Sequence, residues 1–181
     1  MFLETSRLIL RKFREEDFAD YAVWRGDEEI NRLMGNSLDV RQTFDWLKDH
    51  EERSYVLVLK ETGRVIGDLT VCTVPADLAA LEPLAGKRGV SLSFAISRDF
   101  RRRGLMTEAL EAVIRRLFEE EGFDYIQCGY LDGNDVSAAL QAKLGFTHLV
   151  TQRFPTEHTE SGEAVSHENV LFRTYEHHRK D

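Results

Sequence analysis

The 181-residue sequence predicts a mixed α+β fold in a single domain, residues 1–181. Two observations support this prediction. Short apolar or alternating runs, typical of strands, are interspersed with amphipathic segments whose apolar residues recur every three or four positions. No internal repeat, low-complexity stretch or abrupt change in composition marks a boundary between two domains.

The first half of the chain is expected to contain a strand, two helices and a hairpin. Residues 7–13 are predicted to form the strand, and the acids at 15–17 begin a helix because negative charge favours a helix N-terminus. Val40, Phe44 and Leu47 share one face of a second helix over 39–50. A turn at 61–64 then joins strands 55–59 and 65–71.

The second half is expected to alternate strands with helices. After an excursion over 75–89 with room for a short helix comes a strand at 91–96, where Leu92, Phe94 and Ile96 face the same way. A long helix over 107–121 and a strand over 125–130 follow. A short helix at 135–144 precedes two closing strands, 146–154 and 167–174, joined by a polar hairpin.

Composition excludes several classes of partner. The formal net charge is −8, so most of the surface would repel nucleic-acid phosphates or an anionic membrane. No segment approaches the ~18 apolar residues of a membrane span, and the first residues have no signal-peptide core. The sequence therefore favours a cytoplasmic protein that binds neither nucleic acid nor membrane.

The cysteines and histidines do not predict a metal site. Cys72 and Cys128 lie far apart, so we expect two buried free thiols, with a disulfide as the alternative if the fold brings them together. The six histidines lack the spacing of metal ligands, and no metal is expected.

One segment predicts an anion site. The run RDFRRRGLMT, residues 98–107, joins a strand to a helix. The first backbone N–H groups of a helix have no partner within it, and they lie at the positive end of the helix dipole. Gly104 permits a close backbone approach to a ligand, and the adjacent arginines add positive charge. The alternative is a solvated basic run at a helix start.

A second helix start lies at residues 132–137. Asn134 is a favourable N-cap, and Ser137 would then lie on the first turn. In isolation, this segment is equally consistent with a plain cap followed by a surface serine.

Three motifs together resemble those of the GCN5-related N-acetyltransferases (GNAT). Residues 101–106, RRRGLM, resemble the R/Q-x-x-G-x-G/A loop of that family, and Asn134, Ser137 and the KLGF run at 143–146 resemble its N-x-x-S…K-L-G-F segment. Residues 4–11, ETSRLILR, resemble the E-T-x-R-L-x-L-R start of the RimJ/RimL-like branch. The resemblance covers nearly the whole chain and implies a GNAT-type, mostly antiparallel twisted sheet of about six to seven strands flanked by helices. It also implies acetyl-CoA as the acetyl donor.

The resemblance further implies which residues act. In this family the loop amides hold the CoA pyrophosphate, the preceding strand pairs with the pantetheine arm, and Ser137 would protonate the departing thiolate. The expected catalytic residues are Ser137 and Asn134. The residues expected to bind acetyl-CoA are Phe94, Ala95, Ile96, Arg101, Arg102, Arg103, Gly104, Leu105, Met106, Thr107, Asn134 and Ser137.

The sequence departs from the family pattern at three positions. Met106 replaces the usual last Gly or Ala of the loop, Gln141 replaces a frequent tyrosine acid, and Ser91 stands where some members carry a glutamate base. The candidates for the base are therefore Glu157 and Glu160 in the polar hairpin and, more weakly, Asp68 and Glu28, although each is also consistent with a plain solvated acid. The aromatic residues Trp24, Trp46 and Tyr130 would either line an acceptor pocket or pack in the core.

The expected function is acetyl transfer from acetyl-CoA to a primary amine by direct attack. The acceptor would be a protein N-terminus or a small-molecule amine. The sequence itself does not indicate the oligomeric state, and a homodimer is suggested only by analogy with relatives. The alternative is a non-catalytic acyl-CoA-binding module, because two familiar catalytic positions are replaced. Nucleic-acid binding through the three arginines is disfavoured by the net charge.

Overall fold

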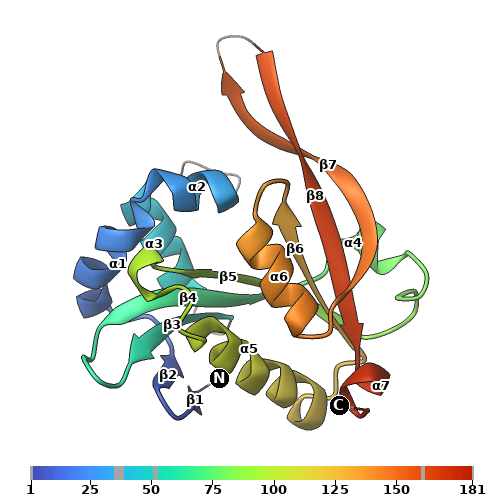
Figure 1. The fold of residues 1–181 in the computed structure, drawn as a ribbon, viewed down its shortest axis with the longest axis horizontal. Coiled ribbons are helices and arrows are strands. Elements are labelled where there is room, and N and C mark those ends of the chain that lie inside the picture. The colour runs from blue at the N-terminus through green and yellow to red at the C-terminus, as the bar shows by residue number, and fades with distance from the viewer. Residues whose placement is uncertain (1, 35–38, 51–52, 160–161, 181) are drawn as a thin grey trace. The chain divides into compact units, whose positions relative to one another are not determined.

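The computed structural model describes residues 2–34, 39–50, 53–159 and 162–180 (Figure 1). Its helices are α1 (Phe18–Arg25), α2 (Glu28–Met34), α3 (Val40–Asp49), α4 (Ala76–Ala79), α5 (Leu105–Arg115), α6 (Asp135–Lys143) and α7 (Tyr175–His178). Short 3-10 turns occupy Glu15–Asp17 and Arg98–Phe100, and a π-helical turn at Arg116–Glu120 continues α5. All the predicted helices are present, whereas α2 and α7 were not predicted.

The strands form one eight-stranded sheet in the order β1-β2-β3-β4-β5-β6-β8-β7. They are β1 (Leu3–Glu4), β2 (Leu8–Arg11), β3 (Ser54–Leu59), β4 (Val65–Cys72), β5 (Gly89–Ile96), β6 (Tyr125–Leu131), β7 (Thr147–Thr159) and β8 (Gly162–Thr174). The β5–β6 pair is parallel, and the β1–β2, β2–β3, β3–β4, β6–β8 and β7–β8 pairs are antiparallel. The predicted α+β class is confirmed, but the strand count of six to seven was too low.

The chain divides into two compact units. The first comprises residues 1–32, 36–70 and 94–113. Its core contains interlocking aromatic rings: the centroids of Phe13 and Phe44 lie 5.6 Å apart, and those of Tyr21 and Phe44 lie 5.4 Å apart. The expectation of a single domain stays a prediction.

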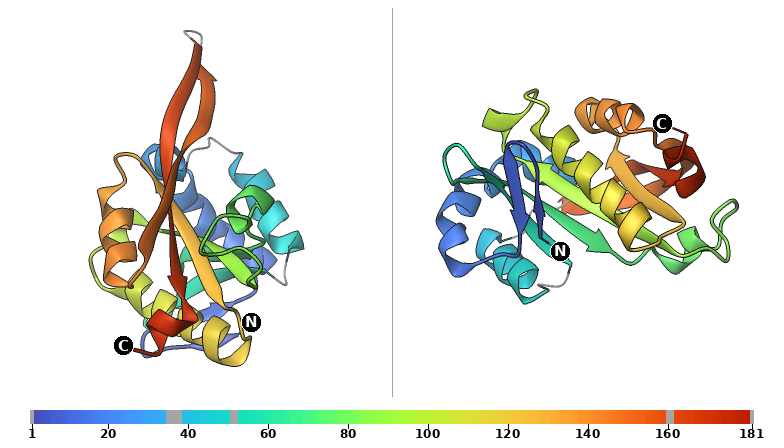
Figure 2. Two further views of the ribbon diagram at one scale, coloured as in Figure 1. Left: turned by 90° about the vertical axis from the view of Figure 1, so that its right-hand side faces the viewer. Right: turned by 90° about the horizontal axis from the view of Figure 1, so that it is seen from below.

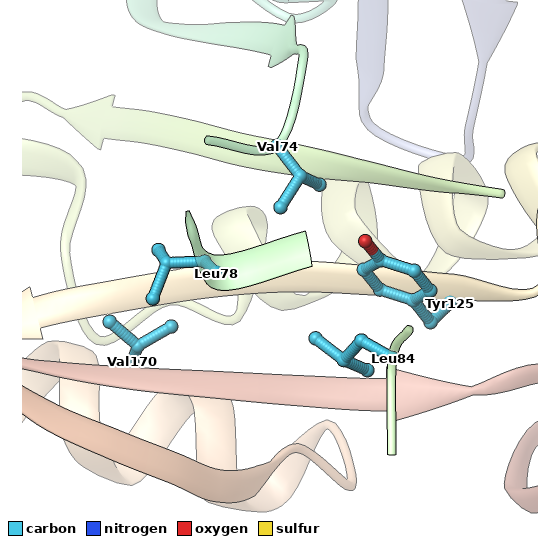
Figure 3. Packing of buried hydrophobic residues seen from close by; sticks show 5 residues of the cluster. All are labelled: Val74, Leu78, Leu84, Tyr125 and Val170. Carbon is cyan, nitrogen blue, oxygen red and sulfur yellow. The ribbon is translucent and has the colours of Figure 1, made fainter. Parts of the chain in front are cut away.

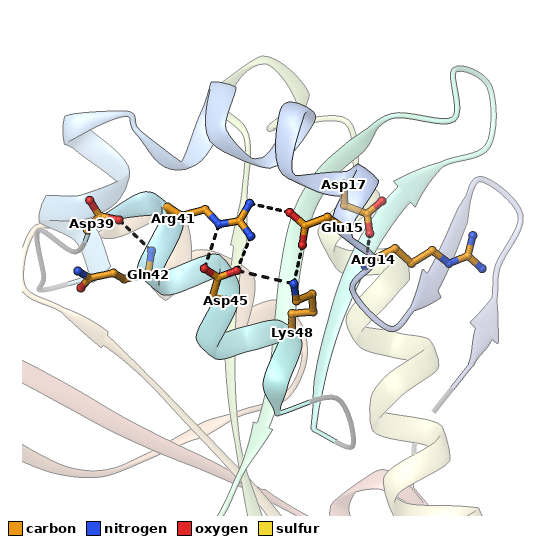
Figure 4. A network of polar contacts seen from close by, with 8 residues as sticks. All are labelled: Arg14, Glu15, Asp17, Asp39, Arg41, Gln42, Asp45 and Lys48. Atoms are coloured by element: carbon orange, nitrogen blue, oxygen red, sulfur yellow. Dashed lines mark hydrogen bonds and ion pairs between the residues drawn. The ribbon is translucent and has the colours of Figure 1, made fainter.

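A polar network on the first unit joins the turn before α1 to α3 (Figure 4). Glu15 accepts hydrogen bonds from Arg41 at 2.7 Å and Lys48 at 2.5 Å, and Arg41 also pairs with Asp45. The hydrogen bonds from Arg41 and then Lys48 lower the pKa of Glu15 to about 2. The acids that begin the predicted helix thus also anchor it to the next long helix.

The second unit comprises residues 33–35, 71–93 and 114–181. Five buried side chains form its apolar cluster: Val74, Leu78, Leu84, Tyr125 and Val170 (Figure 3). β7 and β8 form a long twisted ribbon whose backbone extends well past the predicted strand ends (Figure 2). No helix in the described parts of the chain is both long and apolar enough to cross a membrane.

The face alternation predicted for β5 is wrong in its second half. Leu92 is buried as expected, but the next buried residue is Ala95, whereas Phe94 and Ile96 are only partly buried. At this point of the strand the Asp68 side chain, from β4, accepts the backbone N–H of Ala95. This departure from the predicted alternation lies in the segment expected to contact the donor thioester.

Candidate functional site

The segment between β5 and α5 is an open turn. Arg102 and Gly104 both have positive φ angles, 60° and 73°. This left-handed conformation destabilises a non-glycine residue by roughly 1–2 kcal/mol. Gly104 is exposed, and a Cβ built on it would meet one group within 4 Å, the Arg7 side chain at 3.5 Å. The turn therefore faces solvent.

The first turn of α5 leaves its backbone donors unpaired. Glu108 N–H donates to Gly104 O at 3.0 Å, as in a regular helix. The N–H groups of residues 104–107 donate to none of the described residues. The first four N–H groups of any helix lack a partner within the helix and must be satisfied from outside it. Here they lie beside Arg102 and Arg103, which are exposed, and the first of them belongs to the exposed Gly104. The arrangement is suited to binding an anion.

Residues 5–7 of the N-terminal motif are hydrogen-bonded to this turn and to the start of α5. One oxygen of the Glu108 carboxylate accepts three hydrogen bonds: from the Thr5 hydroxyl at 2.5 Å, the Ser6 hydroxyl at 2.9 Å and the Arg7 backbone N–H at 2.8 Å. The other oxygen accepts a hydrogen bond from Arg7 Nε at 2.7 Å. Arg7 Nη1 also donates to the carbonyl of Arg103 at 2.8 Å. Residues 5–7 therefore hold both the turn and the start of α5.

This contact also fixes the charge of Glu108. Partial burial acts to raise the pKa of its carboxyl, but the hydrogen bonds from Thr5, Arg7 and Ser6 lower that pKa to about 2. Glu108 is thus a carboxylate at neutral pH, and Arg7 balances its charge close to the turn before α5. We did not predict this contact from the sequence, although the ETSR run and an acid in the first helical turn were both visible.

The arginines of the turn have separate roles. Arg101 Nη1 donates to Glu29 on α2 at 3.1 Å, and Arg98 binds both Glu29 and Asp27. The side chain of Arg101 is therefore engaged by a carboxylate. The Arg103 guanidinium lies 5.2 Å from the centroid of the Phe100 ring. Arg102 and Arg103 are exposed, so these two remain open to an external anion.

Asp68 brings a buried carboxyl to β5. Its side chain is 7% exposed and accepts the Ala95 N–H. Burial raises the pKa of Asp68 to about 6, against the opposing effects of the Arg25 charge, the Tyr21 hydroxyl and the Ala95 N–H. The hydroxyl of Tyr21 faces this carboxyl from α1, outside ordinary hydrogen-bonding geometry. The Ala95 N–H is therefore engaged within the protein and is not available to a ligand.

The second predicted segment lies in the other unit and starts α6. Asn134 caps the helix as predicted: its side-chain oxygen accepts the Ser137 N–H at 3.1 Å. The Ser137 hydroxyl accepts a hydrogen bond from Gln141 Nε2 at 2.9 Å, and Gln141 is 1% exposed. Gln141 therefore connects the predicted catalytic serine to β6, where its amide also contacts Cys128 and Gly129.

Residues 7–147 match the family of acetyltransferase (GNAT) domains. The chain belongs to the GNAT acetyltransferase family. Enzymes of this family use acetyl-CoA as co-substrate, and the chain is accordingly an acyltransferase.

Solved structures share this GNAT fold. A GNAT-family acetyltransferase from Bacillus anthracis is 15% identical, with a TM-score of 0.78 over 97% of this chain and 99% of that one. The ribosomal-protein-S5-alanine acetyltransferase from Vibrio fischeri is 15% identical, with a TM-score of 0.73 over 97% of both chains. An acetyltransferase from Agrobacterium tumefaciens is 20% identical, with a TM-score of 0.68 over 96% and 94%. At these identities the likeness concerns the fold.

The remaining candidates of this GNAT chain differ in their surroundings. Glu160 lies outside the described residues, and only the backbone of Glu157 is described. Glu28 is exposed at the start of α2. Asp68, by contrast, is buried, and this burial raises the pKa of its carboxyl.

The three aromatic residues considered for the acceptor pocket also differ. Trp24 is buried, which fits core packing, and Tyr130 is half-buried. Trp46 is 51% exposed and stacks on His50 with ring centroids 4.1 Å apart, so it does not belong to the core. Within the described residues, no group of three or more His, Cys, Asp or Glu side chains could hold a metal ion.

Proposed function

We propose that this GNAT enzyme transfers the acetyl group of acetyl-CoA to a primary amine by direct attack of the amine on the thioester. The observation that carries the proposal is the open start of α5, where four N–H donors and exposed arginines meet no protein acceptor among the described residues. A diphosphate fits this arrangement because its oxygens accept hydrogen bonds and its charge complements the helix dipole.

The donor is assigned to three sets of residues. The backbone of residues 101–107 binds the pyrophosphate, with Arg102 and Arg103 adding attraction, and residues 94–96 lie along the pantetheine arm. Asn134 and Ser137 act at the thioester sulfur, where Ser137 gives its proton to the departing thiolate. Met106 is buried in the first turn of α5, so its side chain serves packing while its N–H remains available to the ligand.

We assign the removal of the amine proton to Asp68. An alkylamine has a pKa near ~10, so attack requires a base that is ionised at neutral pH. Asp68 meets this requirement because its pKa of about 6 leaves it ionised at pH 7, and it contacts the strand assigned to the thioester through Ala95. Most of the rate enhancement would come from positioning of amine and thioester.

The acceptor is a protein N-terminus or a small-molecule amine. The ETSRLILR opening supports the RimJ/RimL-like branch, which is named for acetylation of ribosomal-protein N-termini. A cytoplasmic location and a homodimer belong to the same proposal.

Two measurements on the wild-type protein test the proposal. Calorimetry with acetyl-CoA is expected to show binding, and a panel of peptides and small amines is expected to include at least one that releases free CoA thiol together with an acetylated product. Binding with no turnover on any amine would favour the acyl-CoA-binding module instead. Failure to bind acetyl-CoA would contradict the site at the start of α5.

A further inference from the structure

A buried amide connects α6 to β6 beside the serine assigned to the leaving group. Cys128 Sγ donates to Gln141 Oε1 at 2.8 Å. Gln141 Nε2 donates to the Gly129 carbonyl at 2.9 Å and to Ser137 Oγ at 2.9 Å. All four groups belong to the second unit, and Gln141 is 1% exposed.

The partners determine which way the amide faces. A backbone carbonyl can only accept, so the side-chain NH2 of Gln141 must face Gly129. The amide oxygen then faces Cys128, whose thiol is a donor because burial raises its pKa well above the ordinary value and keeps it protonated. The hydrogen-bonding chemistry of these partners therefore determines the orientation of the Gln141 amide.

This orientation fixes the role of the serine oxygen. The NH2 group has two hydrogens, one for Gly129 and one for Ser137, so Ser137 Oγ is an acceptor toward Gln141. A helical serine often gives its own proton to the carbonyl four residues earlier, here Gly133, but no such bond is present. None of the described residues accepts the Ser137 hydroxyl proton.

We infer that Gln141 is a positioning residue that presets the Ser137 hydroxyl as a hydrogen-bond donor toward the leaving sulfur. The inference rests on the proposed function of Ser137. Its chemical advantage is twofold. The Gln141 N–H occupies one lone pair of Oγ, which leaves the proton free to point elsewhere, and it stabilises negative charge on Oγ as that proton departs.

The proton transfers balance as follows. The amine nitrogen forms a bond to the acetyl carbon, and the C–S bond breaks with its electron pair moving to sulfur. Ser137 gives its proton to that sulfur, which yields the free thiol of CoA. Counted from the neutral amine, the attacking nitrogen loses one proton to Asp68, which releases it to solvent, and solvent returns one proton to Ser137 Oγ, so this step consumes no net proton.

A double-mutant cycle separates this role from simple packing. Ser137→Ala is expected to lower kcat roughly tenfold, because a thiolate leaves readily even without an acid. Gln141→Leu, which is similar in volume, is expected to lower kcat about as much with little change in the KM for acetyl-CoA. In the Ser137→Ala background, Gln141→Leu is expected to lower kcat by less than about twofold, since its effect passes through the missing hydroxyl.

A matched control and a fold check accompany the cycle. The control is Gln152→Leu, which removes a half-buried glutamine of the same unit that donates to Glu168 at 2.8 Å. In the presence of this substitution, Ser137→Ala is expected to lower kcat by the same factor as it does in the wild type. Calorimetry with CoA and thermal unfolding verify that each variant is folded. If Gln141→Leu lowers kcat equally in both backgrounds, Gln141 has only a structural role and the inference is overturned.

A further outcome distinguishes this inference from the proposed function. If wild-type turnover is measured but Ser137→Ala has full activity, the positioning role of Gln141 is wrong while acetyl transfer stands. If the wild type shows no turnover at all, the proposed function itself fails.

Discussion

The starts of α5 and α6 are built from similar local parts but satisfy their backbone donors differently. Each follows a strand and a glycine with positive φ, Gly104 or Gly133. At α6 the Asn134 side chain accepts a first-turn N–H. At α5 the donors of residues 104–107 find no protein acceptor among the described residues, and the nearby Glu108 is held by residues 5–7.

The difference shows how a fold keeps a helix start available to a ligand. A side-chain oxygen at the N-cap closes the helix start, whereas its omission leaves an anion site. At α5 the first-turn acid would compete for the same donors if it were free. Its capture by Thr5, Ser6 and Arg7 therefore keeps the α5 donors exposed.

The largest effect is expected from Gly104→Glu. The new carboxylate would repel the pyrophosphate at the open donors, which costs several kcal/mol, so Kd for acetyl-CoA should rise more than about 100-fold in calorimetry. Gly63→Glu is the matched control, because Gly63 also has a positive φ, 70°, and has no neighbour within 4 Å of a built Cβ. Wild-type affinity in the Gly104 variant would show that the anion lies elsewhere.

Asp68→Asn tests the β4 carboxyl that accepts the Ala95 N–H of β5, the strand that leads into α5. We expect kcat to fall about 100-fold and the rise of kcat with pH near 6 to disappear, because an amide cannot accept the amine proton. The same substitution should increase the stability of the folded protein at neutral pH, because it removes a buried carboxylate. Folding raises the pKa of Asp68 from 3.8 to about 6. The resulting contribution to the free energy of unfolding is fully present below about pH 3.8 and is lost as the pH rises through 6. The total loss is up to about 3 kcal/mol.

The two readouts for Asp68 separate a base from a structural acid. Thermal unfolding between pH 4 and 8 should show the wild type losing stability relative to Asp68→Asn as pH rises. If the stability curves behave in this way while kcat and its pH profile stay unchanged, Asp68 is buried for structural reasons and another group accepts the proton.

Arg7→Gln is expected to loosen the open helix start without removing it. Loss of the Glu108 ion pair and the Arg103 contact should raise the KM for acetyl-CoA by about tenfold, or ~1.4 kcal/mol, with kcat little changed. Arg64→Gln is the control, since Arg64 is similarly exposed and pairs with Asp20 at 3.3 Å, also in the first unit. Equal effects of the two substitutions on KM would contradict a specific role for residue 7.

The smallest effect is expected from changes to the capped helix. Asn134→Ala should lower the free energy of unfolding by about 1 kcal/mol because an N–H of α6 loses its acceptor, and this shifts Tm by about 2–4 °C. Asn134→Asp retains a capping oxygen and should remain within a few tenths of a kcal/mol of wild type. An unchanged Tm for Asn134→Ala would mean that the two helix starts differ less than their contacts indicate.

Local chemistry explains what the sequence predicted well. The hairpin of β3 and β4 and the cap at Asn134 depend on residues a few positions apart, and both are present. The loop before α5 was predicted as an anion site for the same reason, since its glycine, arginines and helix start are contiguous.

Features that depend on distant partners were missed. α2 spans only seven residues, of which Ile30 is buried, and β1 has only two residues, so neither segment is long enough to give a clear sequence pattern. Asp68 resembles a surface acid in the sequence, yet it is buried because α1 and β5 supply its neighbours. The engagement of Arg101 by Glu29 joins positions 72 residues apart. No local pattern encodes such contacts.

The hydrogen bonds to Glu108 also affect the order of folding. Thr5, Ser6 and Arg7 reach this carboxylate across 101 to 103 positions of chain. Contacts of such separation close large loops and form slowly compared with local turns. During synthesis the amino-terminal residues emerge long before their partner exists, so coenzyme affinity is expected to develop late, after the helical segment carrying Glu108 has been translated.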